Sequence, residues 1–187
     1  MGARIERRSD GVWTVDGVGV QGLAEPEDVL DMGNSGTAAR LLAGALASLG
    51  GIACMTGDGS LRGRPMQRVI GPLEAMGACF MARSGGRMPF VIHGSKSLTP
   101  LDYASPVASA QVKSAILLAG LAAPGETRIV EPAMSRDHTE RMLKRMGAIV
   151  SSETVGTGWG VFLQGQSELT AIDVDVPADP SSAAFPL

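Results

Sequence analysis

Cysteine and lysine are scarce in this chain of 187 residues, and each shortage limits what the protein can be. The two cysteines, Cys54 and Cys79, lie in apolar runs, so we expect buried free thiols rather than a disulfide or a metal site. No group of residues has the ligand spacing of a zinc or calcium site, and no metal is predicted. Lysine supplies only three of the 16 basic residues. The bias toward arginine suits forked recognition of carboxylate or phosphate, although a GC-rich genome produces the same bias.

Long apolar runs and a targeting segment are also missing. The most apolar stretch, residues 41–55, is interrupted by glycines and Ser48 and is too short to cross a bilayer. The first residues lack the charged, apolar and small-residue order of a signal peptide, so we expect a cytoplasmic protein without membrane attachment. The net charge of −3 argues against a broad nucleic-acid surface. The composition is that of an ordinary packed globular protein.

The tripeptide MGA occurs three times, at Met1, Met76 and Met146. Each copy begins a segment with a strand-like run, a turn that contains glycine and a second strand-like run. This order is typical of a β-hairpin. The sequence therefore predicts hairpins starting at residues 1, 76 and 146.

The segments between these hairpins repeat as well. LLAG occurs at 41–44 and at 117–120, each time in a predicted helix that is followed by a strand-like stretch, 50–58 or 125–132. An amphipathic helix precedes the second and the third hairpin. Similarity at a period of about 70–76 residues indicates equivalent structural units. We predict an α/β fold of repeated β-α-β-α-β-β units packed around a shared helical core.

The two amphipathic helices have predicted buried faces. The first face consists of Met66, Val69, Ile70, Leu73 and Met76. The second consists of Thr139, Met142, Leu143 and Met146. In the second helix, Asp137 and Glu140 form a plausible cap pair, and Glu140 can also pair with Lys144 one turn later.

The repeat is out of phase with the two ends of the sequence. The chain begins at a hairpin without the helices that precede the other two hairpins, and it ends in VPADPSSAAFPL, typical of a polar turn entering a helix. We predict that residues 1–187 form a single partial domain with an incomplete unit at each end, and that the chain is a fragment of a longer protein.

The stretch GNSGTAARLLAGAL, residues 33–46, places a tight polar turn before a helix and Arg40 in the first turn of that helix. A cation there opposes the helix dipole, which favours negative charge at the N-terminus. One explanation is a bound anion in front of the helix. The alternative is a simple helix cap by Asn34 or Ser35.

Three arginines, Arg62, Arg64 and Arg68, surround Pro65, which fits the first position of the next helix. They repel one another unless they face an anion or are solvated, and a solvated face remains the alternative. No Walker A or GxGxxG motif explains these stretches as nucleotide sites.

Two later segments have the same character. Ser109 is a natural cap, and it is followed by Gln111 and by Lys113, again a cation in a first helical turn. Ser135 and Arg136 precede the second amphipathic helix, whose His138 is a surface or local hydrogen-bonding residue rather than a metal ligand. Together these helix starts predict a site for oxyanions such as phosphates and carboxylates. The sequence offers no Ser-His-Asp grouping, no reactive cysteine setting and no metal set.

Five motifs in order resemble one family: GNSGTAAR, RGRPMQRVIGPLEAMGA, SAQVKSAILLAGL, SRDHTERML and DPSSAAFPL. The family is that of 5-enolpyruvylshikimate-3-phosphate synthase, the enolpyruvyl transferase of the shikimate pathway to aromatic amino acids. The resemblance extends from about Gly33 to the end of the chain. The related UDP-N-acetylglucosamine enolpyruvyl transferases use a catalytic cysteine in a loop, and neither cysteine of this chain has such a setting.

The resemblance implies a fold of two similar domains, each with three β-α-β-α-β-β units, of which this chain is most of the domain formed by the N-terminal half. It also implies transfer of the enolpyruvyl group of phosphoenolpyruvate to shikimate 3-phosphate with release of phosphate, without a metal or organic cofactor. The family's Lys-Ser-…-Arg motif would precede Met1, and the acid–base residues of the second domain would follow Leu187. The isolated chain is then expected to be inactive. The alternative function is a stand-alone anion-binding module without catalysis.

Site residues are also implied by the resemblance. The implied phosphoenolpyruvate site consists of Asn34, Gly36, Arg64 and Gln111, with Asn34 and Arg64 as the catalytic residues. The implied shikimate 3-phosphate site consists of Ser109, Ala110, Gln111, Ser135 and Arg136. Many relatives have a second serine in place of Ala110, so one hydroxyl contact is expected to be absent. Glyphosate, an inhibitor that occupies the phosphoenolpyruvate site of the family, is an expected ligand.

Overall fold

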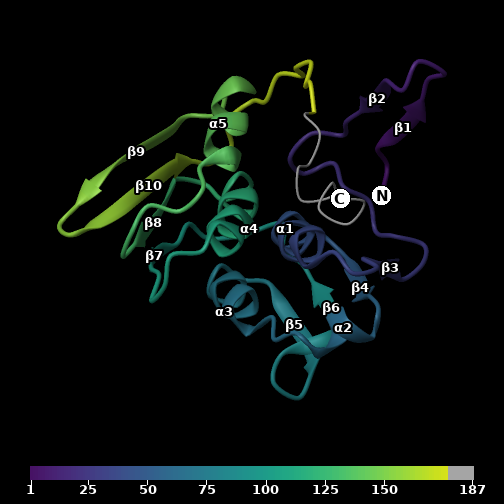
Figure 1. Cartoon of the computed structure of the whole chain (residues 1–187), viewed down its shortest axis with the longest axis horizontal. Helices are drawn as coiled ribbons and strands as arrows, with labels where there is room; N and C mark the ends of the chain where they lie inside the picture. The colour runs from purple at the N-terminus through teal and green to yellow at the C-terminus, as the bar shows by residue number, and fades with distance from the viewer. Residues whose placement is uncertain (177–187) are drawn as a thin grey trace, which may run out of the picture.

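Two units with the same order of elements make up most of the computed structural model, which describes residues 1–176 (Figure 1). The first unit contains β3 (Leu30–Asp31), α1 (Gly36–Leu46), β4 (Ile52–Thr56), α2 (Gly59–Gly63), α3 (Gln67–Ala75), β5 (Cys79–Arg83) and β6 (Arg87–His93). The second unit contains β7 (Asp102–Ala104), α4 (Ala110–Gly120), β8 (Glu126–Glu131), α5 (His138–Arg145), β9 (Val150–Val155) and β10 (Gly158–Gln164). Apart from the short additional helix α2, the second unit repeats the first. The helix start predicted within residues 177–187 lies outside the described residues.

Each unit forms one four-stranded sheet, and the two sheets have equivalent strand orders. The orders are β3-β4-β6-β5 and β7-β8-β10-β9. In both sheets the first two strands are parallel, because a helix crosses over between them, and the last two form an antiparallel hairpin. The predicted β-α-β-α-β-β unit is confirmed.

The MGA repeat has a physical cause at the end of each amphipathic helix. Gly77 follows α3 and Gly147 follows α5, with φ angles of 112° and 93°. After α3, the N–H groups of Gly77 and Ala78 donate to the carbonyls of Glu74 and Leu73, and the same pattern recurs after α5. Glycine adopts this left-handed conformation without the steric cost of a Cβ atom. The repeat therefore marks helix ends that redirect the chain into a hairpin.

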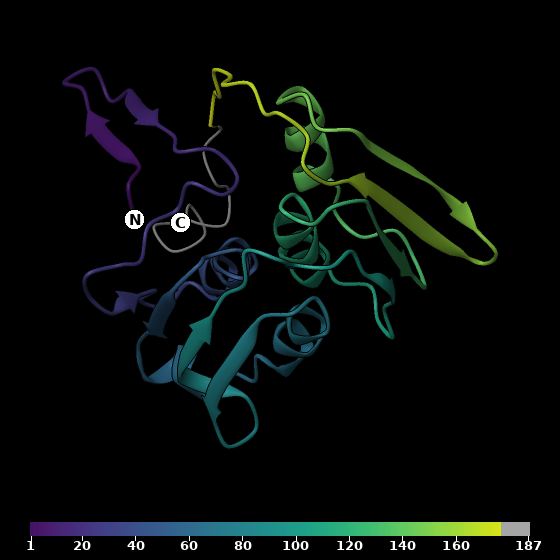
Figure 2. The same ribbon diagram turned by 180° about the vertical axis from the view of Figure 1, so that it is seen from behind.

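Helices α1 and α4 pack against each other between the two sheets (Figures 1 and 2). Small residues allow this close contact, since a Cβ atom on Gly44 would overlap the backbone of Ala115. Ala39, Leu46, Ile116 and Leu117 are fully buried around this contact. The predicted shared helical core is confirmed; Gly44 of the first LLAG and Ala115, which precedes the second, are its small residues at this contact.

The predicted helix faces are confirmed for α3 and partly wrong for α5. The five residues predicted for the first face are all buried. In α5, Thr139 and Leu143 are buried, whereas Met142 is 41% exposed. The prediction that Pro65 begins a helix is wrong, because α3 begins at Gln67. Arg64, the residue before the proline, has the extended backbone (φ −80°, ψ 133°) that a following proline favours.

Both cysteines are free, but the expectation that both are buried is wrong. Cys54 is half-buried on β4, whereas Cys79 is exposed on β5, an edge strand of its sheet. The edge position leaves the start of β5 open to solvent. Within residues 1–176, no group of three or more His, Cys, Asp or Glu side chains is arranged to hold a metal ion.

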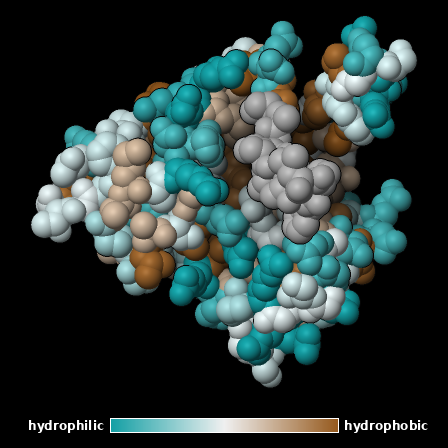
Figure 3. All heavy atoms as spheres, in the orientation of Figure 1, coloured by the Kyte–Doolittle hydropathy of each residue, from teal (hydrophilic) through white to brown (hydrophobic). Residues whose placement is uncertain are grey.

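The N-terminal hairpin, β1 (Arg4–Arg7) with β2 (Trp13–Asp16), stands apart from both sheets (Figures 1 and 2). Ile5, Trp13 and Val15 are each about 60% exposed, and hydrophobic atoms lie among hydrophilic ones on this hairpin in Figure 3. Among the described helices, none is long and apolar enough to cross a membrane.

Candidate functional site

The turn before α1 is held by two neighbouring polar residues with different tasks. Ser35 is the N-cap, and its side chain accepts a hydrogen bond from the N–H of Ala38 (3.1 Å). Asn34 does not cap the helix. Its Nδ2 donates to Asp58 Oδ2 (2.6 Å), and its Oδ1 accepts from Arg64 Nη2 (3.1 Å). Asn34 therefore connects the start of α1 to both ends of α2.

Arg64 and Asp58 flank the short helix α2. Asp58 caps α2 by accepting from the N–H of Leu61 (2.8 Å), while Arg64 follows the helix and also donates to Ser60 Oγ (3.2 Å). The hydrogen bond from Asn34, followed by that from Leu61, lowers the pKa of Asp58 below its usual value. Asp58 is therefore ionised at neutral pH, and its charge keeps the Asn34 amide turned toward it.

Arg40 joins the N-terminal ends of α1 and α4. Its Nη1 donates to the carbonyl oxygen of Gly36 (3.1 Å) and to Oε1 of Gln111 (3.0 Å). Gln111 in turn donates through Nε2 to Thr37 Oγ1 (2.8 Å). Burial, then the charges of Arg64 and Arg68, lower the pKa of Arg40. Like charges gathered at a helix N-terminus repel one another, and an anion between them would relieve that repulsion.

These cations border a cavity of about 490 Å³. Its lining consists of Arg40, Arg64, Pro65, Met66, Gln67, Arg68, Ser109, Gln111 and Val112. Gly36 lies at the edge of the cation cluster, because a Cβ atom there would stand 2.7 Å from Arg40 Nη1 and 3.1 Å from Arg64 Nη1. The structure thus brings Asn34, Gly36, Arg64 and Gln111 together at one place. Arg62 does not line the cavity, since its Nη1 donates to the carbonyl of Gly57 (2.9 Å).

Two of the other predicted residues, Ser109 and Ser135, meet at a buried carboxylate, Glu131, at the end of β8. Its Oε1 accepts from the backbone N–H of Ser109 (2.7 Å), and its Oε2 accepts from Ser135 Oγ (2.7 Å). Ser109 also caps α4, with a long contact of 3.5 Å from the N–H of Val112. Ala110 is the first residue of α4 and is half-buried. Arg136 is exposed, and no side chain within the described part of the chain pairs with it.

The prediction that Lys113 is a cation at an anion site is wrong. Lys113 is 1% exposed, and its Nζ lies 3.2 Å from Glu131 Oε2 and 2.6 Å from Glu140 Oε1. The Lys113 side chain, one helical turn beyond Ser109, points into the protein rather than toward the cavity. Two predicted roles of Glu140 are also wrong. It does not pair with Lys144, because its side chain faces inward, and it forms no cap pair, because Asp137 makes no side-chain cap bond.

Two carboxylates that contact predicted site residues were not predicted, and they occupy equivalent places. Asp58 follows β4 and Glu131 ends β8, which are the second strands of the two units. Each carboxylate binds a residue of the predicted site, Asn34 or Ser109. An acidic residue at the carboxyl end of the same strand in both repeats was the available sequence signal.

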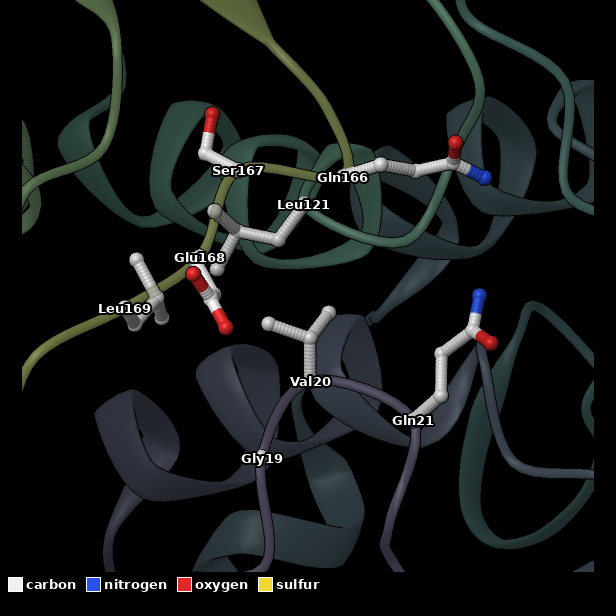
Figure 4. A pocket seen from close by; sticks show the side chains of 8 residues that line it. All are labelled: Gly19, Val20, Gln21, Leu121, Gln166, Ser167, Glu168 and Leu169. Atoms are coloured by element: carbon white, nitrogen blue, oxygen red, sulfur yellow. The ribbon is translucent and has the colours of Figure 1, made fainter.

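A second cavity, of about 510 Å³, lies between the segment 19–21 and the segment 166–169, beside Leu121 (Figure 4). Figure 4 shows Val20 and the carboxylate of Glu168 directed into it. Among residues 1–176, no arginine or lysine lines it, so the described lining lacks the positive charge that would hold an oxyanion. The arginine-lined cavity is therefore the candidate functional site.

The fold and this site define an α/β repeat protein with a cationic cavity at the meeting point of two helix N-termini. Comparison with known proteins agrees with that class and narrows it. The model of the family EPSP synthase (3-phosphoshikimate 1-carboxyvinyltransferase) matches residues 1–187. The chain belongs to the EPSP synthase family.

The relatives show how closely the chain follows the family. It is 61% identical over 189 residues to the 3-phosphoshikimate 1-carboxyvinyltransferase of Granulibacter bethesdensis and 59% identical over 192 residues to that of Rhodospirillum rubrum. Both matches cover 100% of this chain, but 42% and 43% of the relatives. The solved EPSP synthase from Acinetobacter baumannii superposes with a TM-score of 0.87 at 47% identity, covering 99% of this chain and 41% of that one. The chain thus spans about two fifths of the length of these relatives.

Proposed function

We propose that these residues form a substrate-binding half-site of a longer synthase in the shikimate pathway. The complete enzyme transfers the enolpyruvyl group of phosphoenolpyruvate to shikimate 3-phosphate and releases phosphate. The observation that carries the proposal is the gathering of Arg40, Arg64 and Gln111 between the N-terminal ends of α1 and α4. Guanidinium forks and free helix N–H groups suit the phosphate and carboxylate of these substrates. The names of the relatives support the same reaction.

In this proposal the phosphoenolpyruvate anion lies against Gly36, Arg64 and Gln111. Arg64 is the main donor, because its guanidinium borders the cavity and is held from behind by Asn34. Asn34 acts chiefly by aiming Arg64, since its own amide is already bonded to Asp58. Donors fixed before the substrate arrives stabilise charge that develops on oxygen during the reaction.

Shikimate 3-phosphate is proposed to bind along the start of α4 and the segment before α5. Ser109, Ala110 and Gln111 lie on the first side, and Ser135 and Arg136 lie on the second. Ala110 offers no hydroxyl, so the phosphate depends on the other donors. The exposure of Arg136 leaves its guanidinium available to an incoming phosphate.

Proton transfer has to come from outside this half-site. Arginine stays protonated and cannot serve as the acid or base, and the carboxylates Asp58 and Glu131 are both engaged by protein donors. We therefore propose that a second domain of the same protein supplies the acid–base residues, and that residues 1–187 are a partial domain. The cytoplasmic location stays a prediction.

The first test is binding without turnover. We expect the 187-residue chain to release no phosphate from shikimate 3-phosphate plus phosphoenolpyruvate, yet to bind shikimate 3-phosphate with a dissociation constant of about 1 mM or weaker, equivalent to about 4 kcal/mol. An NMR titration should shift the amide signals of residues 109–111 and 135–136. Turnover by the chain alone would contradict the half-site, and shifts confined to other segments would contradict the proposed residues. Addition of the missing domain distinguishes the alternative, since a stand-alone anion-binding module would remain inactive.

The second test concerns glyphosate, which we propose binds in the phosphoenolpyruvate site. In a full-length synthase with this domain, Gly36→Ala is expected to raise the inhibition constant of glyphosate more than the KM for phosphoenolpyruvate. The added methyl group would push against the guanidiniums of Arg40 and Arg64, and the longer inhibitor has less room to shift than the substrate.

Gly71→Ala on α3 is the matched control, because a Cβ atom there meets no other atom within 4 Å. Both constants are measured for the parent enzyme and the two variants. A parallel rise of both constants in Gly36→Ala would show that this position does not discriminate between the two ligands.

A further inference from the structure

We propose that Glu131 is a specificity-determining residue that holds the hydroxyl of Ser135 in the absence of substrate and competes with the substrate phosphate for it. This inference rests on the proposed function. Its starting point is that one buried carboxylate binds two residues of the proposed shikimate 3-phosphate site. Oε1 accepts from the N–H of Ser109 (2.7 Å), and Oε2 accepts from the hydroxyl of Ser135 (2.7 Å).

A serine hydroxyl has one hydrogen to donate, and in this structure Ser135 donates it to Glu131. A phosphate ester that is fully ionised offers only acceptors, so it needs that same hydrogen. Ser135 can therefore bind the phosphate only when its hydroxyl turns away from Glu131. Until phosphate binds, the Glu131 carboxylate is the acceptor that uses the only hydroxyl hydrogen of Ser135.

When the Ser135 hydroxyl moves from Glu131 to phosphate, Lys113 still neutralises the buried Glu131 carboxylate. When Ser135 turns away, Glu131 still has the N–H of Ser109 on Oε1 and the ammonium group of Lys113 at 3.2 Å from Oε2. Glu131 and Lys113 are both 1% exposed, so water is not available to replace a lost partner. The loss of one hydrogen bond from a carboxylate that keeps two partners costs far less than its complete isolation.

The buried cluster of Lys113, Glu131 and Glu140 also carries an unbalanced charge. Lys113 is shared by two buried carboxylates, Glu131 and Glu140, which gives the three side chains a formal charge of −1. This charge lies one hydrogen bond away from the proposed phosphate position and opposes the binding of a second anion. Glu131 thus weakens phosphate binding in two ways, through the hydroxyl that it holds and through its charge.

The variant Glu131→Gln removes both effects at once while keeping the shape of the side chain. The glutamine amide has the shape of the carboxylate, and its oxygen can still accept from Ser109. Its NH₂ group then takes the place of Oε2 and donates to Ser135, which frees the serine hydrogen for phosphate, while Lys113, 3.2 Å from that position, keeps Glu140 as its partner. The three buried side chains then become formally neutral, so the variant is expected to fold. Glu126→Gln is the matched control, because Glu126 is an exposed residue at the other end of the same strand.

The test is an NMR titration of the 187-residue chain with inorganic phosphate, with shikimate 3-phosphate and with phosphate-free shikimate. Glu131→Gln is expected to bind both phosphate ligands about tenfold more tightly, the equivalent of one hydrogen bond to a charged group. Shikimate binding and the Glu126→Gln control should be unchanged. Equal or weaker phosphate binding by the folded Glu131→Gln variant would overturn the inference.

Two further measurements make the outcome specific. In the Ser135→Ala background, only the smaller gain from the removed charge should remain, whereas a gain of full size would show that Ser135 is not the contested group. Where Glu131→Gln does not fold, the ¹³C signal of the Glu131 carboxylate in the unchanged chain is followed instead. Saturating phosphate should shift that signal, and a constant signal would overturn the inference.

The same titration separates this inference from the proposed function. A chain that binds shikimate 3-phosphate no better than inorganic phosphate would contradict the proposed substrate. The comparison of Glu131→Gln with the unchanged chain on inorganic phosphate would still test Glu131.

Discussion

Arg64→Ala in a full-length synthase that carries this domain is expected to lower kcat/KM for phosphoenolpyruvate by the equivalent of about 2–5 kcal/mol. The loss is large because the Arg64 guanidinium borders the cavity, where its fork would bind a desolvated anion. The substitution also leaves the Oδ1 of Asn34 without the hydrogen bond that the structure shows. Steady-state kinetics with phosphoenolpyruvate as the varied substrate measure the effect.

Arg62→Ala is the control for this prediction. This variant removes one positive charge from the same segment as Arg64→Ala. The Arg62 guanidinium that it removes donates to the carbonyl of Gly57 and does not line the cavity. General electrostatic attraction predicts similar losses for both variants. A loss of equal size for Arg62→Ala and Arg64→Ala would therefore reduce the arginine cluster to a solvated charged patch.

Lys113→Met is expected to lower the free energy of unfolding of the chain by about 3–5 kcal/mol. Methionine fills a similar volume, but it leaves Glu131 and Glu140 buried together without their shared cation. Urea denaturation of the 187-residue chain, followed by circular dichroism, measures the change. A purely hydrophobic role for the lysine stem predicts little loss, since methionine preserves that packing.

Lys144→Met on α5 provides the comparison. Lys144 is exposed, and an exposed substitution away from special features usually changes stability by less than about 0.5 kcal/mol. A similar small effect for Lys113→Met would mean that the buried ion pairs contribute nothing to stability.

The repeat architecture could be predicted because its signals are local. Turn glycines, the MGA helix ends and the alternation of apolar residues each act over a few neighbouring positions, and the same local rules recur in both units. The error at Met142 shows the limit of such rules. A 3.6-residue period predicts that one face of α5 is buried, but how wide that face is depends on what packs against it.

From the sequence, only those site residues that lie at the start of a helix could be predicted. Ser109 and Arg64 stand beside small or capping residues, so their setting is visible in the sequence. The direction of Lys113 is not visible, because its partners Glu131 and Glu140 come from β8 and α5. The same holds for Asp58, whose bond to Asn34 joins residues that are 24 positions apart. Long-range pairs between charged groups depend on the tertiary structure that brings them together.

The contact between Gly44 and Ala115 has a consequence for how this protein can change over evolutionary time. The helices α1 and α4 meet there without room for a side chain, and both deliver their N-termini to the arginine-lined cavity. A larger residue at position 44 would spread the helices and widen the gap that Arg40 and Gln111 now bridge. The distance between the two helix N-termini at this cavity thus depends partly on the absence of a side chain at position 44. A larger residue at position 44 would therefore change the packing of the core and the geometry of the candidate site together.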